Sequence, residues 1–230
     1  MAVVGLLVAA GSGERLGAGR PKAFVDCAGR AMLEWSLDAL RLSCDRVVVA
    51  VPAGLEAGDP DRVAGAPSRS GSVRAALAAA PEARVAVVHD AARPLVTPGL
   101  VESCLVALEE GWDGAVAATR ATDTLKDARP EDGRIVATFD RARLWTAQTP
   151  QVFRADVLRR ALAVDAATLA AASDDAALVE AAGGTVRVVD APPDNLKVTS
   201  ALDLRIAEAL LGEREGPVRA GAGAEHSTAR

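Results

Sequence analysis

The sequence predicts an α/β fold: a mostly parallel sheet with helices on both faces and an inserted β-hairpin. Apolar runs typical of buried strands alternate along the chain with segments whose apolar residues recur at helical spacing, which is the pattern of a parallel sheet covered by helices. Half of the 230 residues are hydrophobic, enough for a sizeable core. Near the middle of the chain, a polar and turn-rich stretch interrupts the alternation.

The first expected strand is the continuous apolar run from Val3 to Ala10, which has the character of a strand buried on both faces of a sheet. A helix is expected next, over Met32–Leu40, because its apolar residues recur at helical spacing. A second apolar run, Arg46–Val51, predicts the second strand.

The same alternation continues beyond the second strand. Ser70–Ala80 is expected to be a helix, with Ser68 or Ser70 as its capping residue. Val85–Val88 is the third expected strand. The following helix, Thr97–Glu110, begins with a capping hydroxyl and a proline at the first helical position. Gly114–Ala118 is a further strand.

The middle of the chain departs from this pattern. A turn-rich stretch, Ala128–Gly133, separates Asp123–Lys126 from Arg134–Phe139 and predicts an antiparallel hairpin inserted between sheet elements. We expect one domain over residues 1–212, with the hairpin arm at about 122–145, and a disordered tail over 213–230, where apolar periodicity is lost. The remaining elements are expected to be helices over 155–164, 174–182 and 201–211, the last capped by Thr199 or Ser200, and a short strand over 186–189.

Composition and charge argue against several classes of protein. The formal net charge is −5, aromatic residues make up 3% of the chain and tyrosine is absent, so we expect no nucleic-acid partner. Cys27, Cys44 and Cys104 are widely separated, and only two histidines are present, which argues against a zinc site or a disulfide framework. No apolar run is long enough to span a membrane and no signal peptide is evident, so a cytoplasmic location is expected.

The segment behind the first strand has the composition of a phosphate-binding loop. Glycines allow backbone N–H groups to wrap a phosphate, and Arg15 and Lys22 add charge that suits a triphosphate. No Gly-Lys-Ser/Thr closes a P-loop, and Leu16 stands where a dinucleotide-binding motif needs a small residue. An ordinary turn with two surface cations is the alternative. The loop residues are Ala9, Ala10, Gly11, Ser12 and Gly13.

Polar residues follow the third strand and recur near the end of the chain. Asp90 comes directly after a buried strand, where a carboxylate needs a partner or a metal ion, although it could also be a turn residue. Arg93 could bind a phosphate or pair with Asp90, and His89 is expected to be packed and hydrogen-bonded rather than a base. Lys197 lies between two apolar residues, so a short strand would project it away from the core; a solvated surface lysine is the alternative. Ligands of parallel sheets bind beyond the carboxyl ends of the strands, where the glycine-rich segment and the His-Asp segment both fall.

Seven blocks of residues follow one another along the chain in the order of a known family. They are Ala9–Leu16 with Arg20-Pro21-Lys22, Gly65–Val73, His89–Pro94, Asp123–Lys126, Arg141 with Leu144-Trp145, Thr149–Gln151 and Asp194–Thr199. Together they resemble the methylerythritol phosphate cytidylyltransferase family of the nucleotidyltransferase superfamily, over roughly residues 3–211. Two departures are that Ala66-Pro67 replaces a glycine and an often acidic residue, and that Ser173–Ala176 replaces Thr-Asp-Glu-Ala.

The resemblance implies a Rossmann-like fold and the transfer of CMP from CTP to 2-C-methyl-D-erythritol 4-phosphate, with release of pyrophosphate, in non-mevalonate isoprenoid biosynthesis. It also implies Mg²⁺ as the cofactor and a homodimer that exchanges its arms, so that Arg141 acts in the partner's site. The resemblance also assigns roles to single residues. The catalytic residues are Arg15, Lys22 and Lys197, and the metal ligand is Asp90. The nucleotide-binding residues are Ala9 to Gly13, Gly65, Ser72 and Asp90. The residues that bind methylerythritol phosphate are Arg93, Thr124, Arg141, Thr149 and Lys197.

Three alternatives stay open from the sequence. A cytidylyltransferase for another polyol phosphate, such as ribitol 5-phosphate, would share the loop, fold and mechanism, although Ala91-Ala92 before Arg93 favours methylerythritol phosphate. A non-catalytic nucleotide-binding module would keep the fold, but the intact charged residues argue against it. A plain NAD-binding domain is disfavoured by Leu16.

Overall fold

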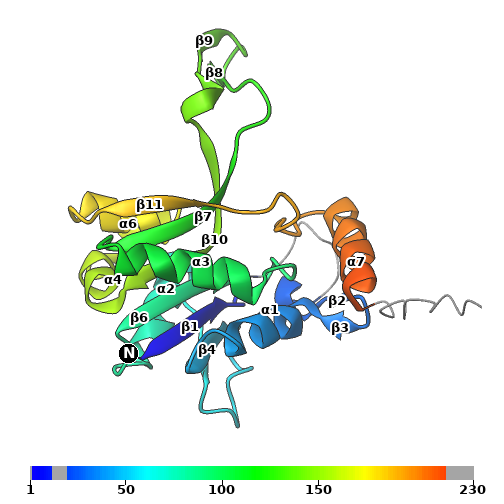
Figure 1. Cartoon of the computed structure of the whole chain (residues 1–230), viewed down its shortest axis with the longest axis vertical. Helices are drawn as coiled ribbons and strands as arrows, with labels where there is room; N and C mark the ends of the chain where they lie inside the picture. The colour runs from blue at the N-terminus through cyan, green and yellow to red at the C-terminus, as the bar shows by residue number, and fades with distance from the viewer. Residues whose placement is uncertain (1, 12–19, 216–230) are drawn as a thin grey trace, which may run out of the picture.

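The computed structural model describes residues 2–11 and 20–215 of the chain (Figure 1). The strands of the main sheet are β1 (Val3–Val8), β4 (Arg46–Val51), β5 (Arg62–Ala64), β6 (Val85–Asp90), β7 (Gly114–Arg120), β10 (Trp145–Arg154) and β11 (Val186–Asp190). They lie in the order β11-β7-β10-β6-β1-β4-β5. Parallel pairing joins β1 to β4 and β6, β4 to β5, and β7 to β11. Two short ladders stand apart: β2 (Asp26–Cys27) with β3 (Arg30–Ala31), and β8 (Lys126–Ala128) with β9 (Ile135–Thr138).

Strand β10 is the exception to the parallel order. It lies between β6 and β7 and is antiparallel to both, so the sheet is mostly parallel, as predicted. The sequence pattern does not predict this strand, because Gln148, Thr149 and Pro150 interrupt its apolar residues. The peptide bond before Pro150 is cis, and the pairing with β7 is irregular in the same stretch. From this irregular stretch, Thr149 hydrogen-bonds to Asp90 at the end of β6.

Helices cover both faces of the sheet, as predicted. They are α1 (Met32–Arg41), α2 (Arg69–Ala78), α3 (Pro98–Glu109), α4 (Ala155–Ala161), α5 (Ala166–Ala171), α6 (Asp175–Ala181) and α7 (Ala201–Glu215), with short 3₁₀ turns η2 (Lys22–Phe24) and η3 (Arg141–Arg143). One hydrophobic cluster joins α2, α4, α5 and α6 to one face, and a second joins α1 and α3 to the other. Successive side chains of a strand point to opposite faces, so Leu6 of β1 lies in the first cluster and Leu7 lies in the second. None of the helices in the described part of the chain is long and apolar enough to cross a membrane.

Helix boundaries follow the capping residues. Ser68 and Thr97 each accept a hydrogen bond from the backbone N–H three residues on, at 3.1 and 3.3 Å, which confirms both caps. Helix α4 ends at Ala161, earlier than predicted, and the short helix α5 is not predicted at all. Asp165 begins α5 by accepting the N–H of Thr168 at 2.8 Å.

Helix α7 packs outside the sheet, on a third cluster that includes Cys27 and Met32. Asp203 accepts the N–H of Ser200 while the Ser200 hydroxyl accepts the N–H of Asp203, a reciprocal cap at the predicted start. The helix continues to Glu215, where Arg214 donates to the carbonyl of Leu95 at 2.9 Å. The prediction that a disordered tail begins at residue 213 is therefore wrong for residues 213–215, which are helical. The rest of the predicted tail, 216–230, lies outside the described residues.

The predicted hairpin arm is present. Strands β8 and β9 project from the body on extensions of β7 and β10 (Figure 1). Every residue from 122 to 143 is exposed in this chain. The exposed residues include Ile135 and Val136, at 57% and 60% of their surface, together with Leu125 and Phe139. One chain alone leaves these apolar side chains uncovered.

The three cysteines are free thiols. Cys27 and Cys104 are buried and Cys44 is half-buried. Burial raises the pKa of Cys27 to about 11, with smaller contributions from nearby carboxylates, and raises the pKa of Cys44 and Cys104 to about 12. The thiols are therefore protonated at neutral pH.

Candidate active site

The carboxyl ends of β1, β4 and β6 lie together at one edge of the sheet. Val8, the last residue of β1, pairs with Ala50 of β4 on one side and with Asp90 of β6 on the other. The described start of the glycine-rich segment, Ala9–Gly11, is therefore a neighbour of the His89-Asp90 segment, as the sequence predicts.

Gly65 brings a second predicted nucleotide-binding segment against the first. Its N–H donates to the carbonyl of Val51 at 2.7 Å, and a Cβ built at Gly65 would lie 2.2 Å from the Cβ of Ala10. Only glycine allows this approach. The Ser72 hydroxyl accepts the N–H of Ala66 at 3.0 Å, so Ser72 shapes the loop that follows Gly65.

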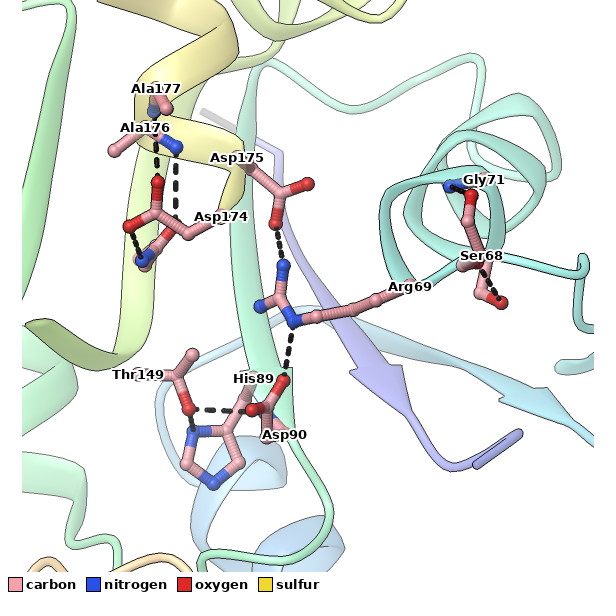
Figure 2. A network of polar contacts seen from close by, with 12 residues as sticks. Ser68, Arg69, Gly71, His89, Asp90, Thr149, Asp174, Asp175, Ala176 and Ala177 are labelled. Atoms are coloured by element: carbon pink, nitrogen blue, oxygen red, sulfur yellow. Dashed lines mark hydrogen bonds and ion pairs between the residues drawn. The ribbon is translucent and has the colours of Figure 1, made fainter. Parts of the chain in front are cut away.

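Asp90 is held between two cations, Arg69 and Lys197, of which Figure 2 shows Arg69. Nε of Arg69 donates to Oδ1 at 2.8 Å, and Nζ of Lys197 donates to Oδ2 at 2.6 Å. Burial raises the pKa of Asp90, but attraction to Arg69 and Lys197 outweighs burial and holds the pKa well below its usual range. The carboxylate is therefore ionised at neutral pH. The expectation that it needs a partner is confirmed.

His89 is fully buried and both of its ring nitrogens are bonded. Nε2 lies 3.2 Å from the carbonyl oxygen of Arg93, and Nδ1 lies 3.0 Å from the Thr149 hydroxyl. A carbonyl only accepts, so Nε2 carries the proton and Nδ1 accepts from Thr149. Burial lowers the pKa of His89 from 6.5 to about 4, and the ring is neutral. The expectation that His89 is a packed, hydrogen-bonded residue is confirmed.

Thr149 connects His89 to Asp90. Its hydroxyl donates to His89 and accepts the backbone N–H of Asp90 at 3.1 Å, and the residue is 3% exposed. A hydroxyl has one proton, so donation to a substrate phosphate would require Thr149 to leave His89. In this arrangement Thr149 fixes the end of β6.

Arg93 forms no ion pair with Asp90. Its Nη1 donates to the carbonyl of Asn195 at 2.7 Å, and among the described residues its Nε has no hydrogen-bond partner. The residue is only 8% exposed. Of the two sequence hypotheses for Arg93, pairing with Asp90 is wrong, and a buried cation without a bonded carboxylate suits an anionic ligand.

Lys197 reaches Asp90 from an irregular segment, not from the short strand that the sequence predicts. Asn195 donates through Nδ2 to the carbonyl of Thr149 at 2.9 Å, and the N–H of Val198 donates to the carbonyl of Ala92 at 2.8 Å. These bonds replace a strand ladder in holding the segment. The ion pair with Asp90 rules out a solvated surface lysine, yet 40% of the Lys197 side chain is exposed.

Two charged residues that the sequence analysis does not single out complete the cluster. Arg69, the first residue of α2, bonds to Asp90 and also to Asp175, the first residue of α6, through Nη1 at 2.5 Å. The partners lie 21 and 106 residues away in sequence, so no local pattern connects them. The available signals were the position of Arg69 inside the Gly65–Val73 block and that of Asp175 inside Ser173–Ala176.

Lys22 is the first residue of the 3₁₀ turn η2. The next residue, Ala23, is buried in the cluster that joins α1 and α3 to one face of the sheet. The predicted site residues Ser12, Gly13 and Arg15 lie outside the described residues.

Thr124 and Arg141 are not brought to the cluster within one chain. Both are exposed on the arm, where Nη1 of Arg141 donates to the carbonyl of Thr122 at 2.7 Å. The arm follows the carboxyl end of β7 and projects outward from the body (Figure 1). Among the described contacts, neither residue bonds to Asp90, Arg69 or Lys197.

A family model described as 2-C-methyl-D-erythritol 4-phosphate cytidylyltransferase matches residues 3–213. The chain belongs to the 2-C-methyl-D-erythritol 4-phosphate cytidylyltransferase family. As a cytidylyltransferase of this family it is an enzyme of the nucleotidyltransferase class, and the NAD-binding and non-catalytic alternatives are not favoured.

Curated relatives and a solved structure agree with this assignment. A 2-C-methyl-D-erythritol 4-phosphate cytidylyltransferase from Saccharopolyspora erythraea is 45% identical over 227 residues, covering 92% of this chain and 100% of the relative. One from Deinococcus radiodurans is 45% identical over 215 residues, covering 92% and 90%. The crystal structure of the cytidylyltransferase from Thermus thermophilus has a TM-score of 0.76 at 37% identity and covers 91% of this chain and 98% of that chain. The predicted Rossmann-like fold is confirmed.

Proposed function

We propose that this cytidylyltransferase joins CMP from CTP to 2-C-methyl-D-erythritol 4-phosphate, giving 4-diphosphocytidyl-2-C-methyl-D-erythritol and pyrophosphate, a step of non-mevalonate isoprenoid biosynthesis. The family match over residues 3–213 carries the proposal. The geometry supports it, because three cations, Arg69, Arg93 and Lys197, gather at the sheet edge that also bears the glycine-rich segment. Such an edge suits two substrates that both carry phosphate.

The reaction is an in-line displacement at phosphorus. A phosphate oxygen of methylerythritol phosphate forms a bond to the α-phosphorus of CTP. The bond from that phosphorus to the oxygen bridging the α- and β-phosphates breaks, and pyrophosphate leaves with the electron pair. The attacking phosphate is already an anion at neutral pH, so no base is needed. The protein's contribution is positioning and charge stabilisation.

The residues divide between the two substrates. Backbone N–H groups of residues 9–13, with Gly65, would bind the nucleotide, and Arg15 and Lys22 would stabilise charge on the α-phosphate and the leaving pyrophosphate. Lys197 and Arg93, which lie on the Asp90 side of the site, would hold methylerythritol phosphate. Lys197 is exposed enough to exchange part of its contact with Asp90 for a phosphate oxygen.

The proposal includes Mg²⁺, which would offset the negative charge of the triphosphate. Among the described residues no group of three or more His, Cys, Asp or Glu could hold a metal ion, so phosphates and water would supply most ligands. Asp90 fits as the single protein ligand, because its carboxylate is ionised and each oxygen accepts more than one bond. Mg²⁺ would neutralise phosphate charge there.

We also propose a homodimer in which the arms exchange. Every residue from 122 to 143 is exposed, and Leu125, Ile135, Val136 and Phe139 form an apolar surface that a second chain would bury. A two-fold dimer buries both arms by the same surface. Arg141 and Thr124, which are exposed on the arm, would then bind the substrate phosphate in the partner's site.

Pyrophosphate release tests the reaction. The four nucleoside triphosphates are each combined with methylerythritol phosphate or ribitol 5-phosphate in the presence of Mg²⁺. CTP with methylerythritol phosphate should give by far the highest rate. An equal rate with ribitol 5-phosphate would overturn the substrate and leave the reaction class in place, and no release from any pair would overturn both.

A further inference from the structure

Four side chains of alternating charge follow one another in space: Lys197, Asp90, Arg69 and Asp175. Figure 2 shows Arg69 between the two carboxylates. Its Nε lies 2.8 Å from Oδ1 of Asp90 and its Nη1 lies 2.5 Å from Oδ2 of Asp175, while Lys197 holds the other oxygen of Asp90 at 2.6 Å. Each acid therefore has its own nitrogen of the guanidinium.

Asp175 is the buried end of this series. Its side chain has no exposed surface, and among the described residues its Oδ1 has no hydrogen-bond partner. Burying a carboxylate is costly, and an apolar pair of similar size would join α2 to α6 at least as well. Stability therefore does not account for the Arg69–Asp175 pair, whereas orientation of Arg69 does.

The shape of the Arg69 guanidinium group couples the position of Asp175 to that of Asp90. The group is planar and its N–H donors have fixed directions. Once Asp175 holds Nη1, the plane of the Arg69 group is set and Nε is aimed at Oδ1 of Asp90. The Asp90 carboxylate is then fixed in rotation, and with it the oxygen that binds Lys197.

We propose that Arg69 and Asp175 are a positioning pair, which acts through Asp90 to place the Lys197 ammonium for the reaction. This inference rests on the proposed function, in which Lys197 binds the phosphate of methylerythritol phosphate. Asp175 is too deeply buried to meet a substrate. Its effect on catalysis must therefore travel through Arg69 and Asp90.

Steady-state kinetics of Asp175→Asn and Arg69→Lys test the pair. Asp175→Asn keeps the size of the side chain and removes its charge, and Arg69→Lys keeps the charge but offers one nitrogen where two are needed. Both should lower kcat by about 10- to 100-fold, as expected for misplacement of a contact near the reacting atoms, with KM for CTP close to the wild-type value. If Asp175→Asn does not fold, Arg69→Lys decides alone. An unchanged kcat in folded variants overturns the proposal.

The chain offers a matched control at the opposite edge of the sheet. Arg46, the first residue of β4, also bridges two acids, with Nε 2.7 Å from Asp61 and Nη1 3.0 Å from Glu82. Asp61→Asn and Arg46→Lys remove the same kinds of contact. They should leave kcat and both KM values at the wild-type level.

Coupling to Lys197 separates positioning from general damage. If the pair acts through Lys197, Asp175→Asn should have little further effect on kcat in a Lys197→Ala background, because residues that act as one unit are not additive. A merely structural effect would instead multiply with that of Lys197→Ala. Such multiplication would overturn the proposal.

A spectroscopic measurement does not depend on activity. The chain has three lysines, Lys22, Lys126 and Lys197, so ¹³C-labelled lysine gives few Cε signals, and Lys197→Arg assigns the relevant one. Asp175→Asn should shift the Lys197 signal and leave that of Lys126 in place, whereas Asp61→Asn should shift neither. If the Lys197 signal of Asp175→Asn has the wild-type chemical shift, the proposal is overturned. If the wild-type enzyme does not react CTP with methylerythritol phosphate, the proposed function fails, and this signal still decides whether Asp175 positions Lys197.

Discussion

At the scale of single residues, each cation of the cluster is bonded, but not to the same kind of group. Lys197 and Arg69 share the carboxylate of Asp90, while Arg93 donates, among the described residues, to the carbonyl of Asn195. Lys197 is also the more exposed of the two cations proposed to bind the substrate phosphate. A phosphate would therefore compete with Asp90 for Lys197 and would meet Arg93 without displacing a carboxylate.

Removing the ammonium of Lys197 should affect the reaction more than substrate binding. Lys197→Ala is expected to lower kcat by ~10²–10³-fold, or about 2.7–4 kcal/mol, because it removes one preorganised charge near the transition state. Arg160→Ala, which removes a surface cation paired with Asp156, should have no such effect. Initial rates over a range of both substrates give kcat and KM. A kcat near that of the wild type would remove Lys197 from the catalytic residues.

The neutral state of His89 predicts a pH dependence of stability. Burial lowers the pKa of His89 from 6.5 to about 4, so between these values the unfolded chain binds the proton and the folded chain does not. The contribution of His89 to stability is therefore present above about pH 6.5 and is lost as the pH falls toward 4.

Urea unfolding of wild type and His89→Gln measures this contribution. Glutamine keeps one donor and one acceptor but does not titrate. The difference in the free energy of unfolding should be greatest above pH 6.5 and should shrink down to about pH 4.5. A difference that stays constant with pH would show that His89 does not carry the effect.

The roles of single residues were predictable where the partners are close in sequence. His89 bonds to Arg93, four positions away, and its role as a packed residue followed from the segment itself. Sequence reasoning did not identify Arg69 and Asp175 as site residues. An arginine on the surface and an aspartate at a helix start are common, and only the fold brings these two together. The short strand expected at Lys197 is wrong for the same reason. The segment is held by a backbone bond to Ala92 and a side-chain bond to Thr149, which do not make a strand ladder.

At the scale of elements, the apolar periodicity predicted the strands and helices that are buried in the usual way. It failed for β10, whose polar residues near Thr149 serve the site, and for α5, which has only six residues. It also left out β5, a three-residue strand at the edge of the sheet. Periodicity therefore describes β1, β4 and β6 at the site, but not β10 and β5, which also contribute to it.

The contact between the loops after β1 and β5 predicts the effect of a single methyl group. Gly65→Ala would place a Cβ 2.2 Å from that of Ala10, so the two nucleotide-binding segments must move apart. We expect a raised KM for CTP and a loss of about 1–3 kcal/mol in the free energy of unfolding.

Gly99→Ala in α3 is the matched control for this methyl group. It meets nothing within 4 Å, and alanine is the better helix former, so stability should stay the same or rise by up to about 1 kcal/mol. Initial rates against CTP and urea unfolding measure both variants. Wild-type KM for CTP in Gly65→Ala would contradict the assignment of this contact to the nucleotide site.

At the scale of the whole molecule, the arm is the feature that one chain does not explain. The sequence predicts the hairpin from its turn residues, but no pattern in one chain says what covers Ile135 and Val136. In the proposed dimer the surface of a second copy covers them, and this proposal has its own test.

Mixing of variants tests whether Arg141 acts in the partner's site. Arg141→Ala and Lys22→Ala should each be weakly active alone. In a mixed dimer with exchanged arms, one site carries both defects and the other carries neither, so co-refolding should raise activity toward half of wild type per heterodimer.

Mixing Lys22→Ala with Lys197→Ala is the control. If both residues serve their own chain's site, every site keeps one defect and activity should not rise. No rise with Arg141→Ala would place Arg141 in its own chain's site.

The burial of the thiols has a practical consequence for following the arm. Reaction with a maleimide or an oxidant requires a thiolate, and the three native cysteines stay protonated at neutral pH. A cysteine introduced at Val136, where 60% of the residue's surface is open in a single chain, would be the fast-reacting thiol of the molecule. Its labelling rate would then report, at each protein concentration, the fraction of arms that lie free in solution.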